Sequence, residues 1–183
     1  TGYAFARLDF KGKDLLFMLV LLTMMVPFQV MMIPLFLESN LLGLLDTYGG
    51  LILPKATSAF GIFMMRSYFA ALPKDLEEAA RVDGANKLQT FVRIVLPLVM
   101  PGIVATAIYT FINAWNEFLY SLILINSTDK MTVSVALKSL QGSEILNWGD
   151  MMAASALVVV PSVIFFMFIQ NKIAGGMTDG AVK

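Results

Sequence analysis

Residues 15–37 read LLFMLVLLTMMVPFQVMMIPLFL, and this uncharged run of 23 residues decides the fold class. The hydrocarbon core of a bilayer is about 30 Å thick and requires roughly 20 apolar residues in a helix. The run is therefore long enough to cross a membrane. Pro27 and Pro34 are expected to kink it, which neighbouring helices tolerate inside a membrane.

Three further segments have a similar length and character. Residues 98–125 carry a single acid in 28 positions, and residues 151–170 carry no charge in 20 positions. Residues 51–72 hold Lys55 and Arg66 near their two ends, from which long side chains can reach the lipid headgroups. The chain is predicted to be an all-α membrane protein, a polytopic bundle of transmembrane helices in a single domain.

The composition excludes most enzyme classes. Hydrophobic residues make up 58% of the chain and charged residues 14%. Without Cys or His, the chain has no disulfide, no thiolate or imidazole ligand for a metal, and no Cys or His nucleophile. Thirteen basic residues balance thirteen acidic residues, so no overall basic field exists for nucleic acid. The phosphate-binding pattern G-x-x-x-x-G-K-[ST] is absent, so we expect no ATP or other cofactor on this chain.

The distribution of Lys and Arg predicts the orientation. Residues 1–14, residues 66–97 and the tail after residue 170 together hold ten of these residues. The alternate pieces, residues 38–55 and 126–150, hold three. Because cytoplasmic loops carry the excess of Lys and Arg, the first group is predicted to be cytoplasmic, including both ends of the chain.

The connector at residues 73–97 reads PKDLEEAARVDGANKLQTFVRIVLP, and its first half has the marks of a short helix. Pro73 suits a first helical position, the acids that follow suit the helix dipole, and Gly84 can form a left-handed stop. An apolar stripe at helical spacing ends in small methyl groups that let another protein approach closely: Leu72, Leu76, Ala79 and Ala80. A solvated connecting loop is the alternative interpretation.

The second half of the connector has its own apolar stripe. Four residues at helical spacing are expected to pack in the core of this protein: Leu88, Phe91, Val92 and Val95. Two short helices joined at a glycine turn and placed between two spans are a shape for docking rather than for catalysis.

The connector also resembles a known family. Glu78-Ala79-Ala80, three residues, Gly84, nine residues and then Ile94-Val95-Leu96-Pro97 is similar to the EAA loop of permease subunits of bacterial ABC importers. Other segments resemble the carbohydrate branch of that family, the MalG-like permeases: residues 2–7, 113–118 and 180–183. Such permeases usually have six spans. The resemblance implies the type I ABC importer permease fold, with about four of six spans present and the N-terminal spans missing.

The resemblance implies roles for five connector residues. In similar permeases the EAA helix is a coupling helix seated in a cleft of a cytoplasmic ATPase. Glu78 would pair there with a basic ATPase residue, Ala79 and Ala80 would allow close seating, Gly84 would make the turn, and Asp83 would add a contact. The simpler interpretations are that Glu78 is an acid that favours the helix dipole and that Gly84 is an ordinary helix cap.

The same resemblance implies the assembly. The chain would be an inner-membrane permease subunit of a binding-protein-dependent sugar importer, and it would not itself be an enzyme. Its expected partners are two ATP-binding subunits that hold ATP and Mg, a homologous second permease, an extracytoplasmic solute-binding protein, the sugar and the lipid bilayer. The sequence does not name the sugar.

The span at residues 98–125 carries two further patterns. Small residues recur every four positions and predict a face packed against a neighbouring helix: Gly102, Thr106, Thr110 and Ala114. Asn113, Asn116 and Glu117 form a polar strip and are candidates for lining the translocation path, because ionisable groups inside spans are costly. The alternative is that Glu117 lies near the outer interface and forms hydrogen bonds across helices.

The loop after this span is expected to contain a short helix. Val133, Leu137 and Leu140 stand at helical spacing within it.

Three other functions compete with an importer permease. A secondary transporter should show inverted repeats and intramembrane charges, and no repeat is visible. A membrane-embedded enzyme would require clustered catalytic groups in the spans, and none is present. A structural membrane subunit would explain the spans but not the spacing of the connector motif.

Overall fold

The computed structural model describes residues 1–140 and 148–178, with side chains as far as residue 169. Every element in these ranges is a helix, as predicted. Contacts divide the chain into two compact units. The first unit comprises residues 1–25 and 58–108 with the end of the last helix, and the second comprises residues 26–57 and 109–170.

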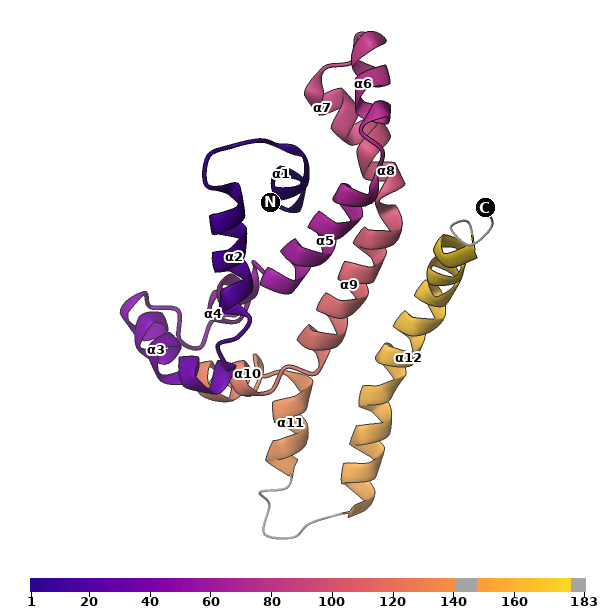
Figure 1. The fold of residues 1–183 in the computed structure, drawn as a ribbon. Coiled ribbons are helices and arrows are strands. Elements are labelled where there is room, and N and C mark those ends of the chain that lie inside the picture. Colours follow the sequence, from indigo (N-terminus) through magenta and orange to yellow (C-terminus); the bar gives the residue numbers. More distant parts are fainter. Residues whose placement is uncertain (141–147, 179–183) are drawn as a thin grey trace. The chain divides into compact units, whose positions relative to one another are not determined.

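The first unit contains the connector. Its helices, in chain order, are α1 (Gly2–Arg7), α2 (Lys13–Thr23), α5 (Ala59–Ala71), α6 (Asp75–Val82), α7 (Lys87–Thr90), the π-helical segment η2 (Phe91–Val95), α8 (Leu96–Leu98) and the first part of α9 (Met100–Trp115). Figure 1 shows α6 and α7 together at one end of α5 and α8, with α1 beside α5.

A small core lies beneath α6 and α7. Phe69, Val95 and Val99 are its buried members. The Tyr3 ring packs edge-on, with its centroid 5.4 Å from that of Phe69 and 4.8 Å from that of Phe91. Because these residues come from α1, α5 and the segment after α7, the core fixes the second half of the connector against α1 and α5.

Small residues bring α5 and α9 together, as predicted for Gly102 and Thr106. A Cβ on Gly102 would lie 2.4 Å from Cγ of Tyr68, so only a glycine fits at this position. The Thr106 hydroxyl lies 3.3 Å from Sδ of Met64, and the methyl of Thr106 lies beside Gly61. The four-residue spacing therefore marks a real helix contact in this unit.

The second unit is built from α3 (Phe28–Leu41), α4 (Tyr48–Ile52), the short 3₁₀ segment η1 (Leu53–Lys55), the end of α9, α10 (Leu119–Leu124), α11 (Val133–Ser139) and most of α12 (Trp148–Thr178). The predicted short helix in the loop after residue 125 is confirmed by α11. The Trp115 indole donates a hydrogen bond to the carbonyl of Val158, 3.2 Å away, which ties the end of α9 to α12.

Asp46 closes a loop in this unit. Its backbone is left-handed, at φ 55°, and its N–H donates to the Leu124 carbonyl at 2.7 Å. Its carboxylate accepts from the N–H groups of Asn126 at 3.1 Å and Ser127 at 2.9 Å, and from the Ser127 hydroxyl. Lys130 donates to the carbonyl of Asp46 at 2.8 Å. The loop before α4 is thereby joined to the loop after α10.

One single helix in the described part of the chain is long and apolar enough to cross a membrane. It covers Trp148–Ile169, 22 residues that include an 18-residue window with a mean hydropathy of 2.4, and it contains the predicted span at 151–170 as far as residue 169. Two bent pairs pass the same test only when each is counted as one span. They are α2 with α3, bent by 96°, and residues 87–98 with α9, bent by 70°.

The other predicted spans are not continuous helices. Residues 15–37 divide near Pro27, whose extended backbone starts α3, while Pro34 remains inside that helix. In residues 51–72, α5 begins only after Ser58, whose hydroxyl accepts from the Gly61 N–H at 3.2 Å. Residues 98–125 also divide, because α9 ends at Trp115. Composition located the apolar segments but did not reveal where caps and prolines interrupt them.

Candidate functional site

The connector turns sharply after α6. The Gly84 N–H donates to the Arg81 carbonyl at 3.1 Å, and the Ala85 N–H donates to the Ala80 carbonyl at 3.0 Å. Gly84 has φ of +83°, where a side chain would be strained. These paired bonds are the Schellman motif that closes many helices. The predicted left-handed stop at Gly84 is confirmed, and Asp83 is the C-cap residue of α6.

A capping box that the sequence analysis did not identify starts the next helix. The Asn86 side chain accepts from the Gln89 N–H at 2.9 Å, and the Gln89 side chain accepts from the Asn86 N–H at 2.9 Å. An Asn followed three residues later by Gln is a readable signal for such a box. The box and the Schellman motif together define both ends of the turn.

The motif residues divide between two faces of α6. Glu78 and Ala79 are exposed, as are Asp83 and Gly84 at the turn. Ala80 is only 4% exposed and packs within this chain. The resemblance implied that Ala80 would face a partner, so the exposed part of the predicted contact surface is smaller than expected.

The second stripe of the connector is only partly buried. Phe91 packs against the core and Val95 is 1% exposed, as predicted. Leu88 is 71% exposed and Val92 is also exposed, so the prediction is wrong for these two residues. For Val92 the reason is the π-helical geometry of η2, which changes the angular spacing on which an α-helical stripe depends, whereas Leu88 precedes this segment, in α7.

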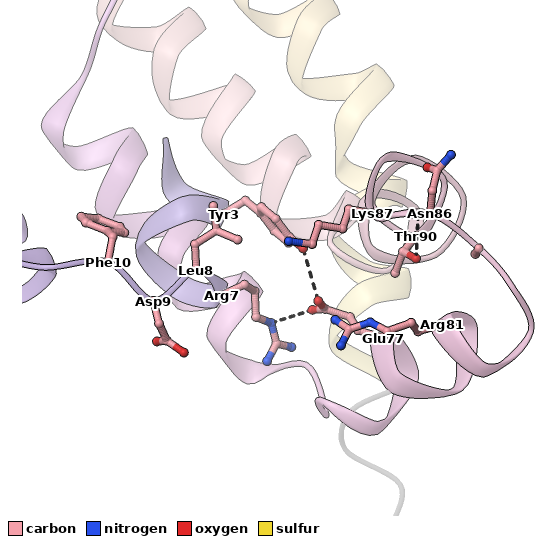
Figure 2. Close-up of a pocket in the computed structure, with 11 residues that line it drawn as sticks. Tyr3, Arg7, Leu8, Asp9, Phe10, Glu77, Arg81, Asn86, Lys87 and Thr90 are labelled. Atoms are coloured by element: carbon pink, nitrogen blue, oxygen red, sulfur yellow. Dashed lines mark hydrogen bonds and ion pairs between the residues drawn. The ribbon is translucent and has the colours of Figure 1, made fainter.

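Glu77, next to the motif glutamate, points toward Arg7 and Tyr3 of this chain (Figure 2). Its Oε1 lies 2.9 Å from Nε of Arg7, and its Oε2 accepts from the Tyr3 hydroxyl at 3.2 Å. The contact of Nε with Oε1 is buried and does not have hydrogen-bond geometry, so charge attraction holds it. Arg7 also donates through Nη2 to the Leu72 carbonyl. The spacing of Tyr3 and Arg7, one helical turn apart in α1, was the available signal.

An open cavity of about 720 Å³ lies beside this network (Figure 2). The charged residues that line it are Arg7, Asp9, Glu77, Arg81 and Lys87. The remaining lining comes from α1, the loop after it, the turn between α6 and α7, and α7 itself: Tyr3, Leu8, Phe10, Ala85, Asn86 and Thr90. The inner face of the connector is therefore accessible and carries charged residues beside apolar ones, while the core lies behind Tyr3.

The three candidate path residues do not form one strip. The Asn113 side chain donates to the Tyr109 carbonyl and that of Asn116 to the Ile112 carbonyl, each at 2.8 Å within α9. Both side chains remain exposed. Glu117 lies beyond the end of α9, so the expected helical spacing of Asn113 and Glu117 on a continuous helix is wrong.

Glu117 instead holds a junction within the second unit. Its carboxylate forms an ion pair with Lys55 and accepts from the Tyr120 N–H at 2.8 Å at the start of α10. The Lys55 ammonium lies 4.3 Å from the Tyr120 ring centroid, and this ring stacks on Phe28. Lys55 was expected to reach the headgroups, and Glu117 provides its partner instead. This geometry matches the alternative of hydrogen bonds across helices.

The comparisons with known proteins identify the family. The profile described as "Binding-protein-dependent transport system inner membrane component" matches residues 1–179. The chain belongs to this family.

Relatives within the family are named as sugar transport permeases. The chain is 40% identical, over its full length, to the arabinooligosaccharide transport system permease of Halalkalibacterium halodurans and covers 66% of that protein. It is 40% identical to the trehalose transport system permease of Mycobacterium tuberculosis and covers 68% of it. The family resemblance found in the sequence is thereby confirmed.

A solved structure confirms the fold. The crystal structure of a bacterial ABC transporter involved in the import of the acidic polysaccharide alginate matches all of this chain and 66% of its own chain. The TM-score is 0.72 at 28% sequence identity. The chain thus has an ABC importer permease fold and spans about two thirds of the length of these relatives.

Proposed function

We propose that the chain is part of an inner-membrane permease subunit of an ATP-driven, binding-protein-dependent sugar importer. The observation that carries this proposal is the connector: α6 presents Glu78 and Ala79 to the outside and ends in a fixed turn at Gly84. An exposed acid beside a methyl-sized side chain suits a cleft with a basic residue. Val82 is 87% exposed at the same end and offers apolar area for docking.

The contacts inside each unit support the predicted membrane topology. Arg7 and Glu77 meet in the first unit, and both come from pieces predicted to be cytoplasmic. Asp46 and Ser127 meet in the second unit, and both come from pieces predicted to lie outside. Pieces on opposite sides of a bilayer could not make such contacts, because about 30 Å of hydrocarbon would separate them.

The assembly supplies what this chain lacks. Two ATP-binding subunits would hold ATP and Mg, and a second permease would complete the path. A solute-binding protein would deliver the sugar from outside. Because the relatives named above carry arabinooligosaccharides and trehalose, the proposed substrate class is a di- or oligosaccharide.

Asn113 and Asn116 are proposed to line the path. Their side chains are exposed, and each donates one amide hydrogen to a backbone carbonyl of its own helix. The amide oxygens and the second hydrogens can therefore face sugar hydroxyls. Glu117 contributes indirectly, by holding the start of α10.

The proposal is tested by the affinity of the ATPase subunit for the assembled full-length permeases. Glu78→Gln should weaken binding by about 2 kcal/mol or more, roughly 30-fold in Kd, because it removes one partner of a charge pair. Asp75→Asn is the matched control, since it removes an exposed acid from the first turn of the same helix. Equal affinities for the two variants would reject the coupling role of Glu78.

A further inference from the structure

A buried ion pair fastens α6 to a helix 70 positions earlier in the chain. The Arg7 side chain is 5% exposed and that of Glu77 is 18% exposed. The Arg7 guanidinium makes a second contact, with the Leu72 carbonyl just after α5. One side chain of α1 therefore touches both α6 and the segment that leads into it.

Tyr3 extends the same attachment into the core. Its hydroxyl donates to Glu77 at 3.2 Å, while its ring packs edge-on against both Phe69 and Phe91, which also contact each other. Phe69 belongs to α5, and Phe91 follows α7. The carboxylate of Glu77 is thus held by two residues of α1, one of which also packs against α5 and η2.

Close packing leaves α1 little freedom to slide on α5. A Cβ on Gly2 would lie 2.8 Å from Cβ of Met65, so the two backbones are already as near as a glycine allows. Arg66 reaches back and donates to the Phe5 carbonyl at 3.4 Å. The α1 helix therefore forms a rigid seat, and the ion pair joins α6 to it.

The pair differs from surface ion pairs on the same segment. Lys13 and Asp9 approach only to 3.7 Å, and the Asp9 side chain is fully exposed. Exposed pairs of this kind contribute little, because water and salt screen them. A buried pair resists separation, because removal of one partner leaves a charge without compensation.

We propose that Arg7 and Glu77 are positioning residues that make α1 and α6 move as one body. Displacement of α6 by the ATPase then enters the membrane through α1 as well as through α5 and α8. The two adjacent acids have different roles: Glu78 contacts the ATPase, and Glu77 contacts α1 of this chain. This inference rests on the proposed function, because it takes α6 to be the helix that the ATPase moves.

The test measures the distance between α1 and α6 as the ATPase closes. The sequenced chain has no cysteine, so spin labels can be placed at Thr1→Cys, the N-cap of α1, and Asp75→Cys, in the first turn of α6, both exposed positions. The full-length permease is assembled with its partner permease and ATPase subunits in nanodiscs. Pulsed electron paramagnetic resonance distances are recorded without nucleotide and with Mg-ATP and vanadate, whose trapping confirms closure.

The wild-type protein should give one narrow distribution that nucleotide does not shift. Glu77→Gln keeps the shape of the side chain and the contact with Tyr3 but removes the charge, and its distribution should shift when vanadate is added. The swapped variant Arg7→Glu/Glu77→Arg restores the two charges but not the contacts with the Leu72 carbonyl and the Tyr3 hydroxyl, so its shift should be smaller than that of Glu77→Gln. Asp9→Asn, which breaks only the exposed pair, should behave like the wild type.

Three results would overturn the proposal. A nucleotide-dependent shift in the wild type would show that α1 and α6 move separately, and this result does not depend on any variant folding. If the distance distribution of Glu77→Gln were broadened equally with and without nucleotide, the ion pair would stabilise the structure without a role in coupling. A swapped variant no better than Glu77→Gln would show that the charge pair is not the cause.

Failure of the proposed function gives a different result. In that case, the ATPase subunits would not bind the wild-type permeases, and Glu78→Gln would change nothing. If they bind and vanadate is trapped while the wild-type distance shifts, only the positioning role of Arg7 and Glu77 is rejected.

Discussion

Replacing Gly102 by alanine should weaken the contact of α9 with α5. The added Cβ would lie 2.4 Å from Cγ, 2.5 Å from Cδ2 and 2.9 Å from Cδ1 of Tyr68. Cγ is bonded directly to the Cβ of Tyr68, so rotation of the ring about χ2 leaves the closest clash in place. Either χ1 of Tyr68 must change or the backbones of the two helices must separate.

The expected magnitude follows from two opposing effects. Overpacking in a well-packed interior costs about 1–3 kcal/mol, and an overlap of this depth belongs in the upper part of that range. Alanine in place of glycine within a helix returns up to about 1 kcal/mol. The net loss should be about 2 kcal/mol, equivalent to roughly 4–8 °C in Tm for a chain of this size.

The assay is thermal unfolding of the purified permease in detergent, followed by the monodisperse fraction after heating. Gly61→Ala in α5 is the matched control, because its Cβ would meet Ser58 and Thr106 at 3.5 Å, an ordinary contact. That variant should be neutral or more stable by up to about 1 kcal/mol. Tyr68→Ala combined with Gly102→Ala should remove the clash. Equal Tm values for the two glycine variants would refute the close contact.

Two other predictions concern loops. Hydrogen bonds from the Ser127 hydroxyl and N–H, aided by the Asn126 N–H and Lys130, lower the pKa of Asp46 from 3.8 to about 2. The stabilisation that ionised Asp46 gives the fold should be complete above pH 4 and lost as the pH falls through about 2. The ¹³C signal of the Asp46 carboxyl group should titrate with a midpoint near 2. A midpoint at 3.8 would contradict these hydrogen bonds. Asn86→Ala should cost about 1 kcal/mol by removing the capping box. Amide hydrogen exchange across Lys87–Thr90 should then speed up, while exchange in α5 stays unchanged.

Local chemistry in the sequence predicted local structure well. Gly84 produced the expected left-handed stop, and the spacing of Val133 and Leu137 correctly indicated α11. The recurrence of Gly102 and Thr106 predicted a helix contact that the structure contains. In each case, a few neighbouring residues determine the outcome.

Predictions that assumed regular helices were less accurate. The run at residues 51–72 looked long enough to span a bilayer, yet the cap at Ser58 limits α5 to 13 residues. The same assumption placed Val92 in the core, whereas it is exposed in the π-helical segment. Hydropathy measures solvent preference and cannot detect a break in hydrogen bonding.

Site residues were hardest where the partner is distant in sequence. Glu77 and Glu78 are indistinguishable by composition, and only the fold shows that Arg7 neutralises the first and not the second. Glu117 looked like a lone acid in a span until Lys55 appeared beside it. Such pairings depend on contacts across 60 to 70 positions, which periodicity does not encode.

The π-helical segment η2 determines how far α8 is rotated about its axis relative to α7. A π turn behaves as an α-helix with one residue inserted, and each residue in a helix accounts for about 100° of rotation. Deleting one residue from Phe91–Val95 would restore regular hydrogen bonding but would turn α8 by roughly a quarter of a revolution or slightly more. Val95 and Val99 would then leave the core they share with Phe69. The number of residues between Gly84 and Ile94, nine, therefore determines the rotation that places Val95 and Val99 in the core. Insertions or deletions there would be more harmful than most substitutions.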